Sequence, residues 1–194
     1  MDKFILATSS PRRRMLFDKF NIDYVAIESD INEHLDSTDT PLQYTMSLAF
    51  SKAYNVAKSF EKDIVIGADT IVVYNNEILE KPQDEDDAFK MLQSLSGNWH
   101  QVISGLCIIN LSRNIKLVDY DITRVKFRDL SSDTIHKYIK TKEPLDKSGA
   151  YGIQGFGGLL VESISGSYYN VIGLPLVKLD GLLLKHFNKS IIQE

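Results

Sequence analysis

The pattern of apolar and polar positions divides the chain into short strands and amphipathic helices. Continuous apolar and β-branched runs are typical of buried strands, and they occupy 4–7, 24–27, 63–74, 99–109 and, with alternation, 115–127. Apolar residues at helical spacing predict helices that begin near Pro11, Pro41, Asp84, Ser131 and Pro175. Asn75 and Asn76 separate two short strands and predict a tight hairpin, because asparagine tolerates positive φ.

This mixture of hairpins and strand–helix segments predicts an α/β or mixed α+β fold. We expect a strongly twisted mixed sheet with flanking helices and a cleft between two lobes. Toward the C-terminus, 159–164 predicts another strand, and 166–173 predicts its continuation as strand or loop. The 194 residues are 43% hydrophobic, which is enough to bury a sizeable core, so we expect a single domain over 1–194.

Composition excludes several classes of protein. The net charge of −4 argues against a general nucleic-acid binder, which is usually basic. Cys107 is the only cysteine, so an internal disulfide cannot form, and its apolar neighbours favour an inert core thiol. The first apolar run is too short for a signal peptide, and no segment is long enough to cross a membrane. We therefore expect a cytoplasmic globular protein.

Asp69 stands inside the most strongly β-branched run of the chain, between Ala68 and Thr70. A buried carboxylate is costly unless a base, a metal or hydrogen bonds compensate it. Two interpretations follow: Asp69 accepts backbone N–H groups at a strand end, or it is a chemical group of a site. The run alone slightly favours the first, and the rest of the chain reverses that preference.

A phosphate site is indicated where the first strand leads into the first helix. Ser10 is a plausible N-cap and Pro11 a suitable first helical residue, so backbone N–H groups point outward at the positive end of the helix dipole. Arg12, Arg13 and Arg14 oppose that dipole, and a polyphosphate would relieve their mutual repulsion. The alternative is a solvated basic face, but the serine-rich helix start favours phosphate.

Other polar residues occur near predicted element ends. Glu33 could be a metal ligand or a surface carboxylate, and Lys52 could reach into a cleft or solvate a helix flank. Lys81 follows the hairpin, and the glycine-rich segment 143–155 carries Gln154. Cations that hold phosphates, together with carboxylates that hold a divalent metal and activate water, predict hydrolysis of a polyphosphate ester. The chain has neither a P-loop nor a nucleophile–histidine pair.

Six motifs in unchanged order resemble the Maf family from about Phe4 to about Leu183. They are Leu6-Ala7-Thr8-Ser9-Ser10-Pro11-Arg12-Arg13, Gly67-Ala68-Asp69-Thr70, Glu80-Lys81-Pro82, 95–102 (LSGNWHQV), 146–155 (DKSGAYGIQG) and 166–175 (GSYYNVIGLP). The resemblance implies a house-cleaning nucleoside triphosphate pyrophosphatase, an inosine-triphosphatase-like architecture and a possible homodimer. Two departures, Thr8-Ser9 and Ser148, remove no charged group.

The resemblance also implies residue roles. Asp69 corresponds to the general base of the family, and Arg12, Thr70 and Gln154 correspond to the marks of the subgroup acting on dTTP and UTP, rather than on 7-methylguanosine triphosphate. We expect Mg²⁺ or Mn²⁺ at Glu33 and Asp69, and Thr70 and Gln154 to read the base. The residues expected to neutralise the triphosphate are Ser10, Arg12, Arg13, Lys52 and Lys81. The alternative is a non-catalytic nucleotide-binding regulator that uses the same pocket.

Overall fold

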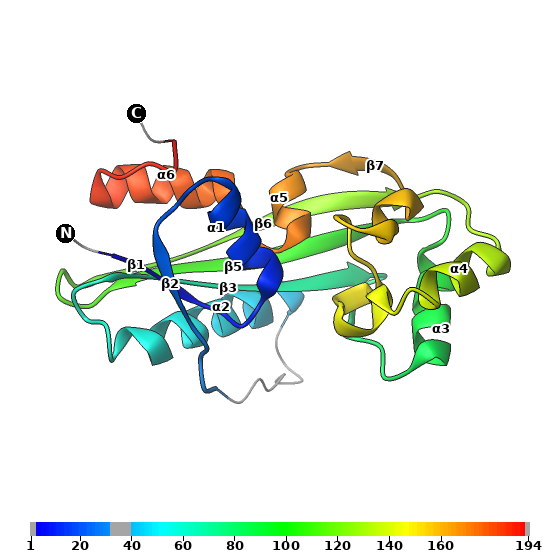
Figure 1. Ribbon diagram of the computed structural model, residues 1–194, viewed down its shortest axis with the longest axis horizontal. Coiled ribbons are helices and arrows are strands. Elements are labelled where there is room, and N and C mark those ends of the chain that lie inside the picture. Colours follow the sequence, from blue (N-terminus) through cyan, green and yellow to red (C-terminus); the bar gives the residue numbers. More distant parts are fainter. Residues whose placement is uncertain (1–2, 32–39, 193–194) are drawn as a thin grey trace. The chain divides into compact units, whose positions relative to one another are not determined.

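The computed structural model describes residues 3–31 and 40–192 of the chain. Its sheet has the strand order β2-β1-β3-β5-β6-β7, and β4 pairs with β3 off this path (Figure 1). The seven strands are β1 (Phe4–Ala7), β2 (Tyr24–Ile27), β3 (Ile64–Tyr74), β4 (Glu77–Leu79), β5 (Trp99–Asn110), β6 (Ile115–Phe127) and β7 (Val161–Ser165).

Helices lie between these strands in the sequence. They are α1 (Pro11–Lys19), α2 (Pro41–Ala57), α3 (Glu85–Leu95), α4 (Ser132–Ile139), α5 (Tyr168–Ile172), α6 (Leu176–Phe187) and the 3₁₀ turns η1 (Glu143–Asp146), η2 (Ser148–Ala150) and η3 (Phe156–Leu160). Strand β1 runs parallel to β2 and β3, whereas β4 is antiparallel to β3 and β7 to β6. The prediction of a mixed α/β fold with a mixed sheet and flanking helices is confirmed.

Local sequence signals set most element boundaries. Thr40 closes a capping box on α2, in which its hydroxyl accepts the Gln43 N–H and the Gln43 side chain returns to the Thr40 backbone. Asp84 caps α3 by accepting the Asp87 N–H at 2.8 Å. At the β3–β4 hairpin Asn75 and Asn76 have φ of 50° and 66°, the left-handed values that the two central residues of a tight hairpin turn require.

The described residues form two compact units. Unit 1 draws on the described residues within Met1–Asp69, Ser104–Asp121 and Gly173–Glu194, and unit 2 on Thr70–Ile103 and Ile122–Ile172. In unit 1, α2 and α6 cover opposite faces of the sheet (Figure 1). The α2 face packs small and branched residues against the strands, among them Ile5, Ala7, Ala49, Ala53, Val65 and Cys107. Cys107 is thus a buried core thiol, as expected, and burial raises its pKa to about 12.

Gly67 decides how closely α2 approaches β3 within unit 1. A Cβ at this position would lie 2.6 Å from the Ala49 carbonyl oxygen and 2.9 Å from the Ala53 Cβ. Real Cβ contacts are longer, so only glycine permits this helix–strand distance. The glycine therefore brings the middle of α2 against the strand two residues before Asp69.

The core of unit 2 lies among β3, β5, β6, α3, α4 and the 3₁₀ turns. Its buried members are Val72, Ala88, Leu92, Leu95, Val102, Val125, Phe127, Ile135, Tyr138, Ile139, Ala150, Tyr151 and Leu160. Gly149, at φ 67°, lies against Val72, where a Cβ would come within 2.8 Å of the Val72 Cγ1. This contact joins the glycine-rich segment to the part of β3 that follows Asp69.

Two predictions for the elements are wrong. The segment expected to continue as strand or loop over 166–173 contains helix α5, because the Asn170 side chain donates to the Val102 carbonyl at 3.0 Å and to the Thr123 hydroxyl at 3.1 Å. Before it, 156–160 is the 3₁₀ turn η3, so the last strand begins only at Val161. In the first helix, Arg13 is buried, whereas Met15 is 44% exposed.

No helix within the described ranges is both long enough and apolar enough to span a membrane.

Candidate functional site

Asp69 and Lys52 form a buried ion pair in unit 1. Lys52 Nζ donates to Asp69 Oδ1 at 2.7 Å, and the two side chains are only 12% and 11% exposed. Lys52 comes from the stretch of α2 that Gly67 allows against β3. The ammonium offsets the cost of burying the carboxylate charge, and such a pair is strongly destabilising to break because one charge is left uncompensated.

This pair and the strand around it test the first interpretation of Asp69, the strand-end cap. Strand β3 continues to Tyr74, so Asp69 is not at a strand end, and its described hydrogen bond is with a lysine. The interpretation as a strand-end cap is therefore wrong. Lys52 in turn does not solvate a helix flank, because its ammonium is held against the buried carboxylate. A carboxylate fixed by a cation can accept a proton from a water molecule placed beside it.

The start of α1 has the predicted helix boundary but not the predicted cap contact. Ser10 occupies the N-cap position and Pro11 the first turn, yet the Ser10 hydroxyl makes no capping hydrogen bond. Instead the Ser10 N–H donates to the Thr8 hydroxyl at 3.0 Å. The first turn of this helix is thus not closed by its own N-cap side chain.

The neighbouring arginines differ in burial. Arg13 is only 9% exposed, and its Nε donates to the Gly173 carbonyl at 2.7 Å, which anchors α1 to the segment before α6 within unit 1. Arg12 is half-buried, and the Arg14 guanidinium donates to the Thr8 and Ser9 carbonyls at 3.4 and 3.3 Å. Arg13 therefore has a structural contact that its sequence position did not predict.

The remaining predicted residues lie in unit 2 or outside the described residues. Thr70 is half-buried in β3, Lys81 is exposed after the hairpin, and Gln154 is exposed in a turn. Glu33, the other predicted metal ligand, lies outside the described residues. Within residues 3–31 and 40–192, no three histidine, cysteine, aspartate or glutamate side chains lie close enough together to hold a metal ion.

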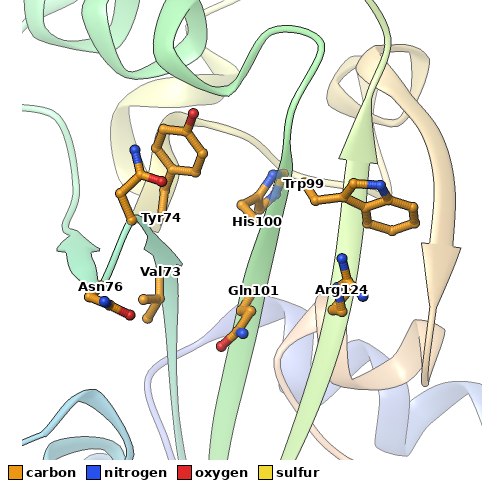
Figure 2. A pocket seen from close by; sticks show the side chains of 8 residues that line it. Val73, Tyr74, Asn76, Trp99, His100, Gln101 and Arg124 are labelled. Atoms are coloured by element: carbon orange, nitrogen blue, oxygen red, sulfur yellow. The ribbon is translucent and has the colours of Figure 1, made fainter.

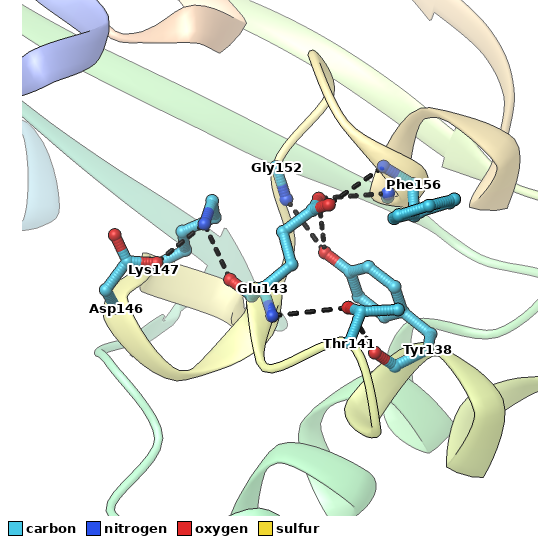
Figure 3. Close-up of polar contacts among 8 residues, drawn as sticks. Tyr138, Thr141, Glu143, Asp146, Lys147, Gly152 and Phe156 are labelled. Atoms are coloured by element: carbon cyan, nitrogen blue, oxygen red, sulfur yellow. Dashed lines mark hydrogen bonds and ion pairs between the residues drawn. The ribbon is translucent and has the colours of Figure 1, made fainter.

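Glu143 is a residue that sequence reasoning did not single out. Figure 3 shows its carboxylate pointing at the backbone of the glycine-rich segment: Oε2 accepts the Phe156 N–H at 2.8 Å, and Oε1 accepts the Gly157 N–H at 3.1 Å. Oε1 also accepts the Tyr138 hydroxyl at 3.0 Å. In the sequence Glu143 only begins the glycine-rich segment, and its contact with Phe156, 13 residues later, is visible only in the fold.

A second buried polar contact in unit 2 joins His100 and Tyr151. His100 is 2% exposed, its Nε2 lies 2.8 Å from the Tyr151 hydroxyl, and its ring packs edge-on against Phe127. Burial lowers the pKa of His100 to about 4 and raises that of Tyr151. The imidazole is therefore neutral at pH 7, and it packs in the core of this unit.

Beside His100, unit 2 has an open pocket of about 340 Å³ (Figure 2). It is lined by Val73, Tyr74, Asn75, Asn76, Trp99, His100, Gln101 and Arg124. The Arg124 guanidinium carbon lies 4.9 Å from the centroid of the Trp99 ring, a cation–π distance. None of the residues assigned to substrate contributes to this lining.

These observations define a mixed α/β protein with a buried lysine–aspartate pair in one unit and a glutamate-anchored, glycine-rich turn in the other. The model of the family described as Maf-like protein matches residues 3–186. The chain belongs to this family, and the prediction from the six motifs is confirmed.

Several relatives are similar over nearly the whole chain. A protein of Clostridioides difficile (strain 630) named dTTP/UTP pyrophosphatase is 49% identical over 184 residues, which are 95% of each chain. Relatives of the same name from Alkaliphilus oremlandii (strain OhILAs) and Pyrococcus furiosus are 45% and 48% identical and cover 99% and 91% of this chain, and 100% and 92% of their own.

Among solved structures, the Staphylococcus aureus Ham1 protein has a TM-score of 0.46 at 15% identity, over 66% of this chain and 73% of its own. The inosine-triphosphatase-like architecture stays a prediction.

Proposed function

We propose that this protein is a nucleoside triphosphate pyrophosphatase that hydrolyses dTTP and UTP to the nucleoside monophosphate and pyrophosphate. The observation that carries the proposal is the buried Lys52–Asp69 pair, with its 2.7 Å contact. A carboxylate that is buried beside a charged partner is a candidate for a functional group. The names of the 43–49% identical relatives support the nucleotide class.

In the proposed reaction, Asp69 is the general base. Its carboxylate takes a proton from the water that attacks the phosphate chain, and the bond between the α-phosphorus and the oxygen bridging to the β-phosphate breaks. Pyrophosphate leaves with the bridging oxygen. Lys52 fixes the position of the Asp69 carboxylate, so the base does not have to reorganise when the water arrives.

The cationic residues hold the triphosphate in this proposal. Arg12 and Arg13 on α1 provide guanidinium groups that match phosphate oxygens, and Lys81 provides an ammonium. The Ser10 hydroxyl, which makes no capping bond, donates to a phosphate oxygen. Together these groups offset the charge of the substrate and of the departing pyrophosphate.

Glu33 and Asp69 are the residues that would hold a divalent cation, Mg²⁺ or Mn²⁺. Mg²⁺ is usually bound by one or two carboxylates together with substrate phosphates and water, so a buried, ionic Asp69 fits such a site as one ligand. Bound there, the cation would supply charge neutralisation of the phosphates and a lowered pKa for the attacking water. Removal of divalent cations with EDTA should therefore abolish turnover.

Base selection is assigned to Thr70 and Gln154. Thr70 directly follows the proposed base on β3, and Gln154 projects from an exposed turn of unit 2. A hydroxyl and an amide can each donate and accept, which suits the carbonyl and N–H edge of uracil or thymine.

A panel of nucleoside triphosphates tests this function. With Mg²⁺ or Mn²⁺, we expect the purified protein to release pyrophosphate from dTTP and UTP faster than from ATP, GTP, CTP and 7-methylguanosine triphosphate. Absence of pyrophosphate from every nucleotide, combined with stoichiometric binding in calorimetry, would instead favour a non-catalytic regulator. Preferred turnover of 7-methylguanosine triphosphate would remove the assignments of Thr70 and Gln154.

A further inference from the structure

Gln154 lies in a turn whose two ends are both fixed by the same side-chain pair. The turn spans 152–155, with the Gly155 N–H donating to the Gly152 carbonyl at 3.4 Å, and Gln154 itself is exposed. Before the turn, the Gly152 N–H donates to the Tyr138 hydroxyl at 3.2 Å. After it, Glu143 accepts the N–H groups of Phe156 and Gly157 at 2.8 and 3.1 Å.

Tyr138 and Glu143 act together, because the Tyr138 hydroxyl donates to Glu143 Oε1 at 3.0 Å while it accepts from Gly152. The carboxylate thus receives three hydrogen bonds, which are strengthened by its charge. Behind it, Lys147 Nζ donates to the Glu143 carbonyl and to Asp146 Oδ1, each at 2.6 Å, so the backbone that carries the carboxylate is also held (Figure 3).

The glycines of this segment are explained by the same contact. A Cβ on Gly155 would overlap the Glu143 carboxylate, and a Cβ on Gly157 would lie 2.6 Å from both the Tyr138 hydroxyl oxygen and the Gly152 carbonyl oxygen. Glycine is needed here because the backbone passes directly over a carboxylate and a phenol. The composition of the turn therefore reflects tight anchoring rather than freedom to move.

We propose that Glu143 is a positioning residue that sets the conformation of the turn carrying Gln154, and through it the affinity for the pyrimidine base. The inference rests on the proposed function, in which Gln154 contacts the base. The Glu143 carboxylate accepts all three of its hydrogen bonds from groups of the protein. It therefore acts through the turn and not on the substrate. Without the Glu143 charge, the turn that carries Gln154 would no longer be held in one conformation, although Gln154 itself would be unchanged.

Steady-state kinetics with dTTP and UTP test this role. Glu143→Gln replaces one acceptor oxygen with an NH₂ group that faces an N–H or O–H donor. We expect KM for both nucleotides to rise about tenfold while kcat changes by about threefold or less, because the phosphates are held elsewhere. Tyr138→Phe should raise KM in the same direction by a smaller factor. Glu162→Gln, the same charge change at an exposed position of β7, should leave both constants unchanged.

The double variant Glu143→Gln/Gln154→Ala separates positioning from general damage to the fold. If Glu143 acts through Gln154, the KM of the double variant should equal the KM of Gln154→Ala alone, because no amide is left to position. Two outcomes would overturn the inference: the KM increases of the two single variants multiply in the double variant, or KM is unchanged in Glu143→Gln. Neither outcome affects the proposed function as long as the wild-type protein turns over dTTP. If the wild-type protein turns over neither nucleotide, the proposed function itself is refuted. Should Glu143→Gln fail to fold, Tyr138→Phe and its double variant with Gln154→Ala carry the same comparison.

Discussion

At the scale of single residues, the Lys52–Asp69 pair combines a stability role with the proposed chemistry. The two side chains are 12% and 11% exposed, and the Lys52 ammonium donates a hydrogen bond to the Asp69 carboxylate at 2.7 Å. Each charge offsets part of the cost of burying the other. Substitution of either residue should therefore change stability, and substitution of Asp69 should in addition remove the base.

Asp69→Asn should lower kcat for dTTP by about 10²- to 10⁴-fold, the range for loss of a general base. The amide keeps the shape of the carboxylate but removes the negative charge beside the Lys52 ammonium, so we also expect a lower melting temperature with an intact fold. Pyrophosphate release and far-UV circular dichroism measure the two effects. Retained turnover by a folded Asp69→Asn protein would remove Asp69 from the base role.

Lys52→Met should destabilise the protein by about 3 kcal/mol, because it leaves a buried carboxylate uncompensated. Urea denaturation followed by circular dichroism gives the free energy of unfolding. The matched control is Lys137→Met, since Lys137 pairs with Asp133 at the same 2.7 Å distance but with both side chains more than 70% exposed. We expect little change in the control. Equal effects of the two substitutions would contradict the interpretation of the Lys52–Asp69 pair as buried.

His100 should make the stability of the protein fall in mild acid. Its pKa is lowered from 6.5 to about 4 by burial, so folding favours the neutral ring. Above pH 6.5 the ring is neutral in the folded and the unfolded protein, so it does not lower the free energy of unfolding. As the pH falls from 6.5 toward 4, the unfolded chain binds the proton more readily than the folded protein, and the free energy of unfolding falls. The full effect is on the order of 3 kcal/mol.

Urea unfolding at pH 7 and pH 5 checks this prediction. His100→Phe retains the edge-on aromatic packing and removes the titrating group, so its free energy of unfolding should fall less between the two pH values than that of the wild type. Identical slopes in the two proteins would show that His100 does not contribute to the pH dependence.

At the scale of elements, local chemistry predicted the starts of the helices but not every helix. Thr40-Pro41, Asp84 and Ser131 begin α2, α3 and α4 as expected, because a cap needs only a side chain and the N–H three residues later. Helix α5 could not be predicted, since its tyrosines and valine favour strands and its Asn170 is fixed by Val102, 68 residues away.

The cap of α3 offers a direct test at this scale. Asp84→Ala removes the acceptor of the Asp87 N–H and should destabilise the protein by about 1 kcal/mol. Asp86→Ala, in the first turn of the same helix, loses only a favourable charge near the helix dipole and should cost a few tenths of a kcal/mol. Urea unfolding of the two variants separates the cap from the dipole.

At the scale of the whole molecule, family and fold class were accessible from sequence because six motifs occur in order along the chain. The buried Lys52–Asp69 contact was accessible only as an alternative, since 17 residues separate its members. Glu143 was missed, because its partners depend on how the segment from Tyr138 to Gly157 folds back on itself. A homodimer and the identity of the metal stay predictions.

The central claim is that the protein cleaves a nucleoside triphosphate between its α- and β-phosphates. The measurement that tests it most directly is ³¹P NMR of dTTP incubated with the purified protein and Mg²⁺. We predict that dTMP and pyrophosphate appear in equal amounts from the first turnovers, with no dTDP. Formation of dTDP and inorganic phosphate, or persistence of dTTP in the presence of folded protein, would contradict the account.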